Sequence, residues 1–298
     1  MRVTNKSLMN NYMNNLNTNL LSMKKYQNQL ASGKEVSRPS DDPFRVIRAM
    51  GFDTAIQQNG QHLKNIDYAR GWVDVTDTAL RGTVGALQNI RGLTVKGANG
   101  DKSDTDLRAI AEEVDQNIRQ LVQVANTNYD GRYVLGGHNT LEAPFEMTTS
   151  GQMAIAHGDN GTIIRKLSPQ VMMEINVDSQ SFFNGPTEDL GTTLKNVYDR
   201  LLAGDQTALS DDSLIKLDEH INKFLSLSAE VGAKQNRLDA AYKKNEADTD
   251  NMKELLSKTE DIDFAEKIMQ YAMMENVYQA TLATGGKILQ PTLLNFLR

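Results

Sequence analysis

The stretch that decides the fold runs from Leu30 to Pro43 and reads Leu-Ala-Ser-Gly-Lys-Glu-Val-Ser-Arg-Pro-Ser-Asp-Asp-Pro. Gly33 predicts the end of a helix, because glycine readily takes the left-handed conformation that follows a last helical turn. Pro39 cannot continue a helical hydrogen-bond ladder. Asp42-Pro43 predicts the next helix, since aspartate caps free N–H groups and proline suits the first helical position. We therefore expect a joint, with Gly33, Pro39, Asp42 and Pro43 as hinge residues.

Apolar residues recur every seven positions before this joint, with tyrosines between them, which is the a/d spacing of a helix that pairs with another helix. The set is Met9, Tyr12, Leu16, Met23, Tyr26 and Leu30. A second apolar set runs from residue 265 to the end of the chain and comprises Ile268, Ala272, Leu282, Leu289, Leu293 and Phe296. We expect the two terminal helices to pack together and then against neighbouring subunits. The predicted assembly interface consists of Met9, Leu16, Met23, Leu30, Leu282, Leu289, Leu293 and Phe296.

Between the two terminal helices the sequence predicts an antiparallel helical bundle. One long helix is expected from residue 43 to 97, with Ile66, Val73, Leu80 and Leu87 seven residues apart. A shorter helix is expected over 103–126 and a second long helix over 211–257. The apolar set of this second long helix is Leu217, Phe224, Val231 and Leu238. Caps are expected at Ser103 and at Ser210-Asp211-Asp212.

The segment 138–187 differs in pattern, because short apolar runs such as Thr162–Arg165 alternate there with Gly and Asn-Gly turns. We interpret it as a small β domain. The predicted fold is mainly α with a small β insert: a long antiparallel helical bundle, paired terminal coiled-coil helices and a central β domain. The predicted domains are a terminal assembly domain (1–42 and 258–298), a bundle domain (43–137 and 188–257) and a β domain (138–187).

Composition excludes several classes of function. The 298-residue chain carries a formal net charge of −6, which disfavours a nucleic-acid partner held by phosphate neutralisation. It has no cysteine, so thiolate catalysis and thiolate metal sites are absent. The N-terminal segment is rich in asparagine and lacks the apolar core of a secretory signal, and we expect no membrane insertion because no apolar run approaches the roughly 18 residues of a membrane span.

The candidate catalytic motifs fail on their spacing. Gly285-Gly286-Lys287 lacks the first glycine and the final Ser or Thr of a phosphate-binding loop. The four histidines, at positions 62, 138, 157 and 220, show no metal-ligand spacing. The carboxylate pairs Asp41-Asp42 and Asp211-Asp212 precede predicted helices, where capping explains them. We therefore expect no enzyme activity, no metal and no cofactor.

Three stretches resemble the bacterial flagellin superfamily. The first is Ser32-Gly-Lys-Glu-Val-Ser-Arg-Pro-Ser-Asp-Asp-Pro, whose wording is closer to the hook-associated members than to flagellins. The second is Asp130-Gly-Arg-Tyr-Val-Leu-Gly-Gly-His-Asn-Thr, followed by Ala143-Pro-Phe. The third is the tail from Asp261 to Arg298. The matches lie near the start, middle and end, so the resemblance spans the chain.

The resemblance implies a structural adaptor at the junction between flagellar hook and filament, located outside the cell and exported by the flagellar type III apparatus. The implied partners are hook-associated protein 1, flagellin, further copies of the chain in a head-to-tail helical array, and an export chaperone. Two alternatives stay open, a flagellin filament subunit and an unrelated cytoplasmic helical scaffold. Because isolated Asn-rich helices are marginal in water, we expect the chain ends to be loosely ordered in the monomer.

Overall fold

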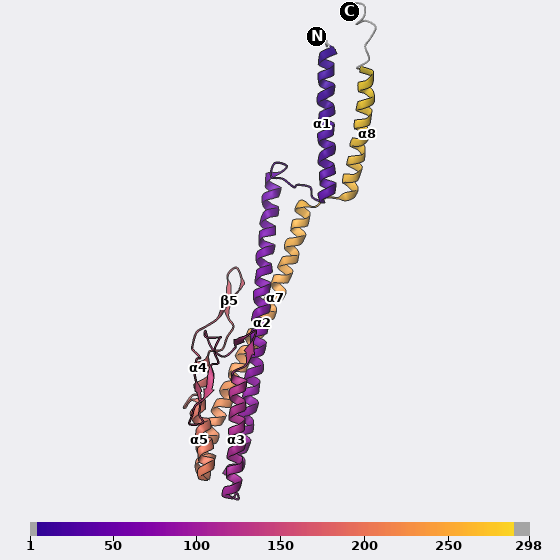
Figure 1. Cartoon of the computed structure of the whole chain (residues 1–298). Coiled ribbons are helices and arrows are strands. Elements are labelled where there is room, and N and C mark those ends of the chain that lie inside the picture. The colour runs from indigo at the N-terminus through magenta and orange to yellow at the C-terminus, as the bar shows by residue number, and fades with distance from the viewer. Residues whose placement is uncertain (1–4, 289–298) are drawn as a thin grey trace, which may run out of the picture. The chain divides into compact units, whose positions relative to one another are not determined.

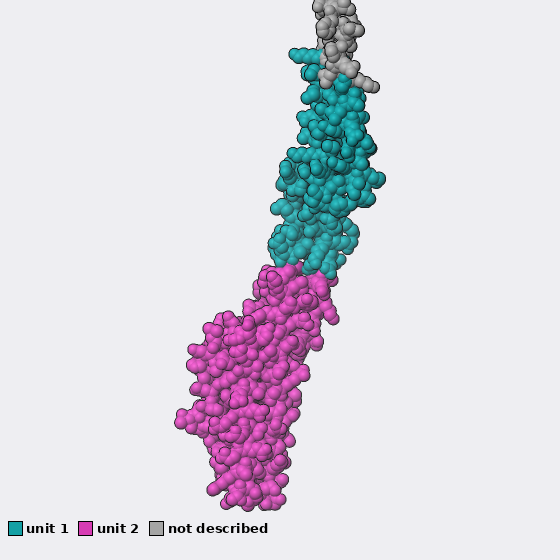
Figure 2. Space-filling model, turned by 45° about the vertical axis from the view of Figure 1, so that its right-hand side comes forward, with its two compact units in different colours: residues 1–58, 248–298 teal, residues 59–247 magenta. Residues whose placement is uncertain are grey.

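The computed structural model describes residues 5–288, which form two compact units (Figure 2). Unit 1 draws on residues 1–58 and 248–298, and unit 2 is residues 59–247. The predicted division into three domains stays a prediction, and the two units group the residues differently. Unit 1 takes in the first turns of the helix after the joint, and the predicted β segment belongs to unit 2.

Unit 1 consists of a terminal helix pair and a joint (Figure 1). The pair is α1 (Asn5–Ser32) and α8 (Phe264–Ile288). The first turns of α2 (Pro43–Ala98) and the last turns of α7 (Leu214–Glu260) complete the unit. The predicted helices over 43–97 and 211–257 are thus confirmed, with bounds shifted by a few residues.

Unit 2 combines the remaining parts of α2 and α7 with α3 (Asp104–Ala125) and α5 (Leu190–Ala203). Its short segments are α4 (Ser179–Phe183), α6 (Gln206–Ala208) and one π-helical turn, η1 (Leu209–Ser213). Six short strands form three separate antiparallel pairs. They are β1 (Asn128–Tyr129) with β2 (Arg132–Tyr133), β3 (Phe145–Met147) with β4 (Met153–Ile155), and β5 (Ile164–Ser168) with β6 (Val171–Glu174). The β insert is therefore a set of hairpins and not one sheet.

The predicted seven-residue repeats form the core of unit 2. Ile66, Val73, Leu80 and Leu87 of α2 are fully buried, as are Leu217, Phe224 and Leu238 of α7. On α3 the buried face is Leu107, Ala111, Val114, Ile118 and Leu121. Burying one such side chain stabilises the folded state by roughly 1.5–3 kcal/mol, so this shared face holds the bundle together.

Two predicted helix starts have different outcomes. Ser103 is confirmed as the cap of α3, in a capping box in which Ser103 and Asp106 satisfy each other's backbone N–H groups. Asp212 lies inside η1 and not at a helix cap. Its carboxylate pairs with Lys216 at 3.0 Å and Arg200 at 2.7 Å. Hydrogen bonds from Lys216 and Arg200 lower the pKa of Asp212.

The insert shares its core with the helices through a row of aromatic rings. Phe145 of β3 lies 5.1 Å from Phe182 of α4, measured between ring centroids, and Phe182 lies 4.9 Å from Phe224 of α7. All three side chains are buried. Because these rings come from three distant parts of the sequence, residues 138–187 depend on the helices for their burial.

The midchain Gly-Gly-His turn is held by Asp159. Its carboxylate accepts hydrogen bonds from the backbone N–H groups of His138 and Gly161. Burial by itself would raise the pKa of Asp159, but these bonds prevail and lower it. Gly137 has a φ of +74°, and a Cβ there would collide with the Asp159 backbone. The glycine is therefore required by the close approach of two turns.

His220 makes the stability of unit 2 depend on pH. The ring is 1% exposed, has Thr193 Oγ1 at 3.2 Å from Nε2, and burial lowers its pKa from 6.5 to about 4. His220 is therefore protonated below about pH 6.5 in the unfolded chain, but only below about pH 4 in the folded chain. We expect the free energy of unfolding to fall by about 3 kcal/mol over that window.

Urea unfolding at pH 7.5 and 4.5 measures this effect, with H220Q compared to the wild type. H157Q is the matched control, because His157 is half exposed beside Glu142. H220Q should lose part of the pH dependence and H157Q should keep it. If the free energy of unfolding changes equally with pH in H220Q and in the wild type, His220 is not the source of the pH dependence.

Candidate assembly interface

The joint has the local geometry that the sequence predicts. Gly33 ends α1 in the left-handed conformation, with a φ of +71°. Asp42 Oδ1 accepts hydrogen bonds at 3.1 Å from the N–H groups of Phe44 and Arg45, and Pro43 is the first residue of α2. The hinge role of Gly33, Pro39, Asp42 and Pro43 stays a prediction.

The joint is also tied to the segment between α7 and α8, about 225 residues away in sequence, a pairing that sequence reasoning missed. Glu35 N–H donates to the carbonyl of Glu260, and Ile262 N–H donates to the carbonyl of Gly33 at 3.1 Å. Two ion pairs flank this short antiparallel contact, Lys34–Glu260 at 2.7 Å and Lys267–Glu35 at 3.0 Å. The segment between α1 and α2 and the segment between α7 and α8 are thus held together by backbone hydrogen bonds.

The double variant D42A/P43G tests the joint. It removes a helix cap and a preset φ, and a lost cap costs about 1 kcal/mol. We expect the first turn of α2 to fray, which should appear as faster amide hydrogen exchange at residues 44–46. Swimming of the cells should decline more than secretion of the protein. D41A is the control, because Asp41 bonds the Arg38 N–H within the loop and not the helix start. Wild-type swimming of the double variant would contradict an organising role.

The terminal helices lie side by side and antiparallel (Figure 1). Asn19 Nδ2 donates to Thr281 Oγ1 at 3.2 Å, and the Lys267 ammonium lies 5.7 Å from the centroid of the Tyr26 ring. Tyr12 packs so closely on Gly285 that any Cβ there would collide with its ring. A groove of about 580 Å³ runs between the helices, lined by residues such as Leu8 and Val277.

The predicted interface residues fall into three groups. Leu16, Met23 and Leu30 are half-buried on the side of α1 that also carries Tyr12 and Asn19, whereas Met9 is 48% exposed. On α8, Leu282 is exposed, as are Ile268 and Ala272 of the same apolar set, so these three residues do not form the face that pairs with α1. Leu289, Leu293 and Phe296 lie outside the described residues. The pairing face of α8 contains Lys267, Tyr271, Met274, Tyr278, Thr281 and Gly285, whose three- and four-residue spacing was the signal that could have revealed it.

Unit 1 is poor in core and rich in exposed apolar surface. Among its described residues it buries three apolar side chains, Val36, Ala49 and Ile262. Most of the exposed large apolar side chains of the described chain also lie in unit 1, although unit 2 is larger. Leu21 and Met269, for example, are each more than 60% exposed. Exposed apolar surface of this extent marks a site of association.

Residues 5–288 contain no group of His, Asp and Glu placed to hold a metal ion. In the same range, none of the helices combines the length and apolarity needed to cross a bilayer. Gly285, the start of the phosphate-loop-like triplet, is covered by Tyr12. The exposed apolar surface of unit 1 is the candidate site, and surfaces of this kind bind other protein chains.

A mainly helical chain with paired terminal helices and a terminal unit rich in exposed apolar surface is typical of structural proteins that bind other proteins. Comparison with protein families agrees. The model of the bacterial flagellin N-terminal helical region matches residues 3–140, and that of the bacterial flagellin C-terminal helical region matches residues 214–297. The chain belongs to the bacterial flagellin superfamily, whose members are structural proteins of the flagellum.

Individual relatives show which members of the superfamily the chain resembles over most of its length. Flagellar hook-associated protein 3 of Salmonella typhimurium is 26% identical over 95% of this chain and 96% of its own length. Phase 1 flagellin of Salmonella naestved is 29% identical, but the match covers 64% of this chain and 37% of that flagellin. A putative flagellar hook-associated protein from Vibrio parahaemolyticus has the same fold, with a TM-score of 0.68 at 19% identity over 74% of this chain and 100% of that structure.

Proposed function

We propose that this protein is a structural adaptor that joins the flagellar hook to the flagellin filament. The observation that carries the proposal is the contrast between the two units. Unit 2 buries a continuous apolar core, whereas unit 1 leaves most of its large apolar side chains in water. Burial of apolar surface stabilises a protein by about 25 cal/mol per Å². Unit 1 should therefore gain most of its stability when neighbouring subunits cover it.

The mechanism is assembly without turnover of a substrate, so the protein is not an enzyme. Its partners are hook-associated protein 1 on the hook side, flagellin on the filament side, and further copies of the chain in a head-to-tail array. Export uses the flagellar type III apparatus, with a chaperone that covers the apolar terminal surface until delivery. We expect the terminal pair to order fully only on contact with neighbours, so that ordering is coupled to binding.

A flagellin filament subunit is the second candidate, because the terminal regions of the chain match flagellin models. The match to hook-associated protein 3 spans nearly all of both chains, and the flagellin match does not. This difference supports a junction protein. The two functions are separated by seeding the purified chain, since a filament subunit elongates into long filaments and a junction protein does not.

Localisation on isolated flagella tests the proposal. An epitope-tagged chain should label a thin zone where hook meets filament, and cells without the protein should release flagellin into the medium. Label along the whole filament would instead identify a filament subunit. Label in the cytoplasm, with no effect of deletion on flagellin release, would identify the helical scaffold.

A further inference from the structure

The first three turns of α2 present two different surfaces. One carries Val46, Ala49, Met50 and Asp53, which line a hollow in unit 1. The other carries Phe44, Ile47 and Arg48. Because an α-helix has 3.6 residues per turn, successive side chains are rotated by about 100° and the two sets point in roughly opposite directions. One helix thus borders a hollow, here called the cup, on one side and carries a projection formed by Phe44 and Ile47, here called the knob, on the other.

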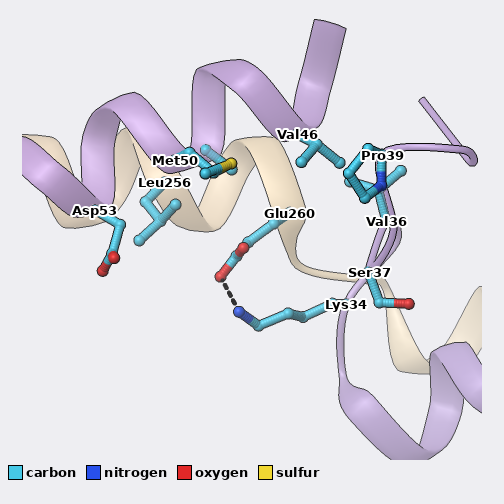
Figure 3. A pocket seen from close by; sticks show the side chains of 10 residues that line it. Lys34, Val36, Ser37, Pro39, Val46, Met50, Asp53, Leu256 and Glu260 are labelled. Atoms are coloured by element: carbon cyan, nitrogen blue, oxygen red, sulfur yellow. Dashed lines mark ion pairs between the residues drawn. The ribbon is translucent and has the colours of Figure 1, made fainter. Parts of the chain in front are cut away.

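The hollow is an apolar cup with a charged rim (Figure 3). Its volume is about 390 Å³, and its apolar wall consists of Val36, Pro39, Val46, Ala49, Met50 and Leu256. A cavity of about 150 Å³ already holds benzene, so the hollow has room for an aromatic ring and a second apolar side chain. Lys34 is paired with Glu260 at 2.7 Å, and Asp53 therefore leaves the rim with net negative charge.

The projection is apolar at its centre and basic around it. Phe44 is 86% exposed, the highest value among the large apolar side chains described, and Ile47 is 69% exposed. Arg45, Arg48 and Lys258 line a second hollow together with Phe44. Arg45 pairs with Asp42 at 3.6 Å and Lys258 pairs with Glu254 at 2.6 Å, so the net positive charge comes from Arg48. The projection and the hollow are therefore complementary, because the apolar projection carries a net positive charge at Arg48 and the apolar hollow carries a net negative charge at Asp53.

We propose that Phe44 and Ile47 of one copy insert into the hollow of the next copy, with Arg48 approaching Asp53. The occupant is a second copy because the same chain carries both complementary surfaces. Since these surfaces lie on opposite sides of one helix, each copy can bind one neighbour through its knob and another through its cup. Such a heterologous contact extends into an open array and does not close into a two-fold dimer. This contact specifies the self-association step and rests on the proposed function.

Cysteine cross-linking tests the contact without background, because the chain has no cysteine of its own. The double variant F44C/M50C places one thiol on the knob and one at the cup. Six residues of helix separate the two positions by about 9 Å, too far for a disulfide within one chain. Oxidation of isolated hook–filament structures should give a ladder of dimers, trimers and larger species. F44C and M50C alone should stay monomeric.

Substitutions provide a second measurement in case the thiol variants disturb the junction. F44A should weaken the contact about 10- to 100-fold and reduce attached filaments, while F44L restores them. Both variants should melt like the wild type, because Phe44 is exposed. L141A is the matched control, since Leu141 is 74% exposed in unit 2. It should leave filament attachment unchanged.

The outcomes separate the contact from the function on which it rests. A double variant that labels the junction but gives no ladder overturns the contact and leaves the function intact. Dimers of F44C alone indicate a symmetric contact and also overturn it, as does normal filament attachment in F44A. Absence of the tagged wild-type chain from the junction overturns the proposed function itself.

Discussion

Deletion of residues 282–298 is expected to abolish filament attachment while leaving the thermal midpoint of the monomer unchanged. The deletion removes Gly285, against which Tyr12 packs, and the exposed Leu282. It touches no residue of the core of unit 2, which runs from Ile66 to Leu238. Because that core supplies the cooperative melting transition, the lost apolar surface should matter only in the assembly.

Circular dichroism melting of both forms and a flagellin blot of the medium measure the two effects. The truncated chain itself must be detected in the medium, as the control that distinguishes failed assembly from failed export. A midpoint lowered by many degrees would place the tail in the core of the monomer. That result would contradict the assignment of the tail to the assembly interface.

F224A is expected to lower the stability of unit 2 by about 3–5 kcal/mol, the usual cost of replacing a buried phenylalanine by alanine. Phe224 is fully buried and meets Phe182 edge to face at 4.9 Å between ring centroids. The loss removes a ring that joins α7 to the insert, so α4 and β3 should loosen with it. For a unit of this size the thermal midpoint should fall by roughly 6–20 °C.

The neighbouring residue supplies the control for this prediction. Leu225 is 50% exposed on the same turn of α7, and L225A should lower the free energy of unfolding far less. Thermal or urea unfolding of the two variants compares them directly. Equal losses in F224A and L225A would show that the aromatic row is not a main element of the core.

The sequence by itself determined the long helices and the core of the bundle. Seven-residue repeats such as Ile66, Val73, Leu80 and Leu87 allow one buried face per helix, because apolar residues at that spacing share one side. Local chemistry determined the joint, since Gly33 and Asp42 act on backbone groups within four residues of themselves. Such short-range interactions can be predicted from the local sequence without knowledge of the rest of the chain.

Tertiary structure decided the features that depend on distant partners. The α8 sequence is apolar on more than one side, and contacts with α1, such as that of Tyr12 with Gly285, select the face that pairs with α1. The hydrogen bond from Ile262 to Gly33 likewise joins segments whose mutual placement no local pattern specifies. Phe44 and Ala49 lie on neighbouring turns of α2, yet Phe44 is 86% exposed whereas Ala49 is 7% exposed and lines the hollow. Burial is a property of the neighbours that surround a side chain, so tertiary packing determined which of the two became a knob and which a wall.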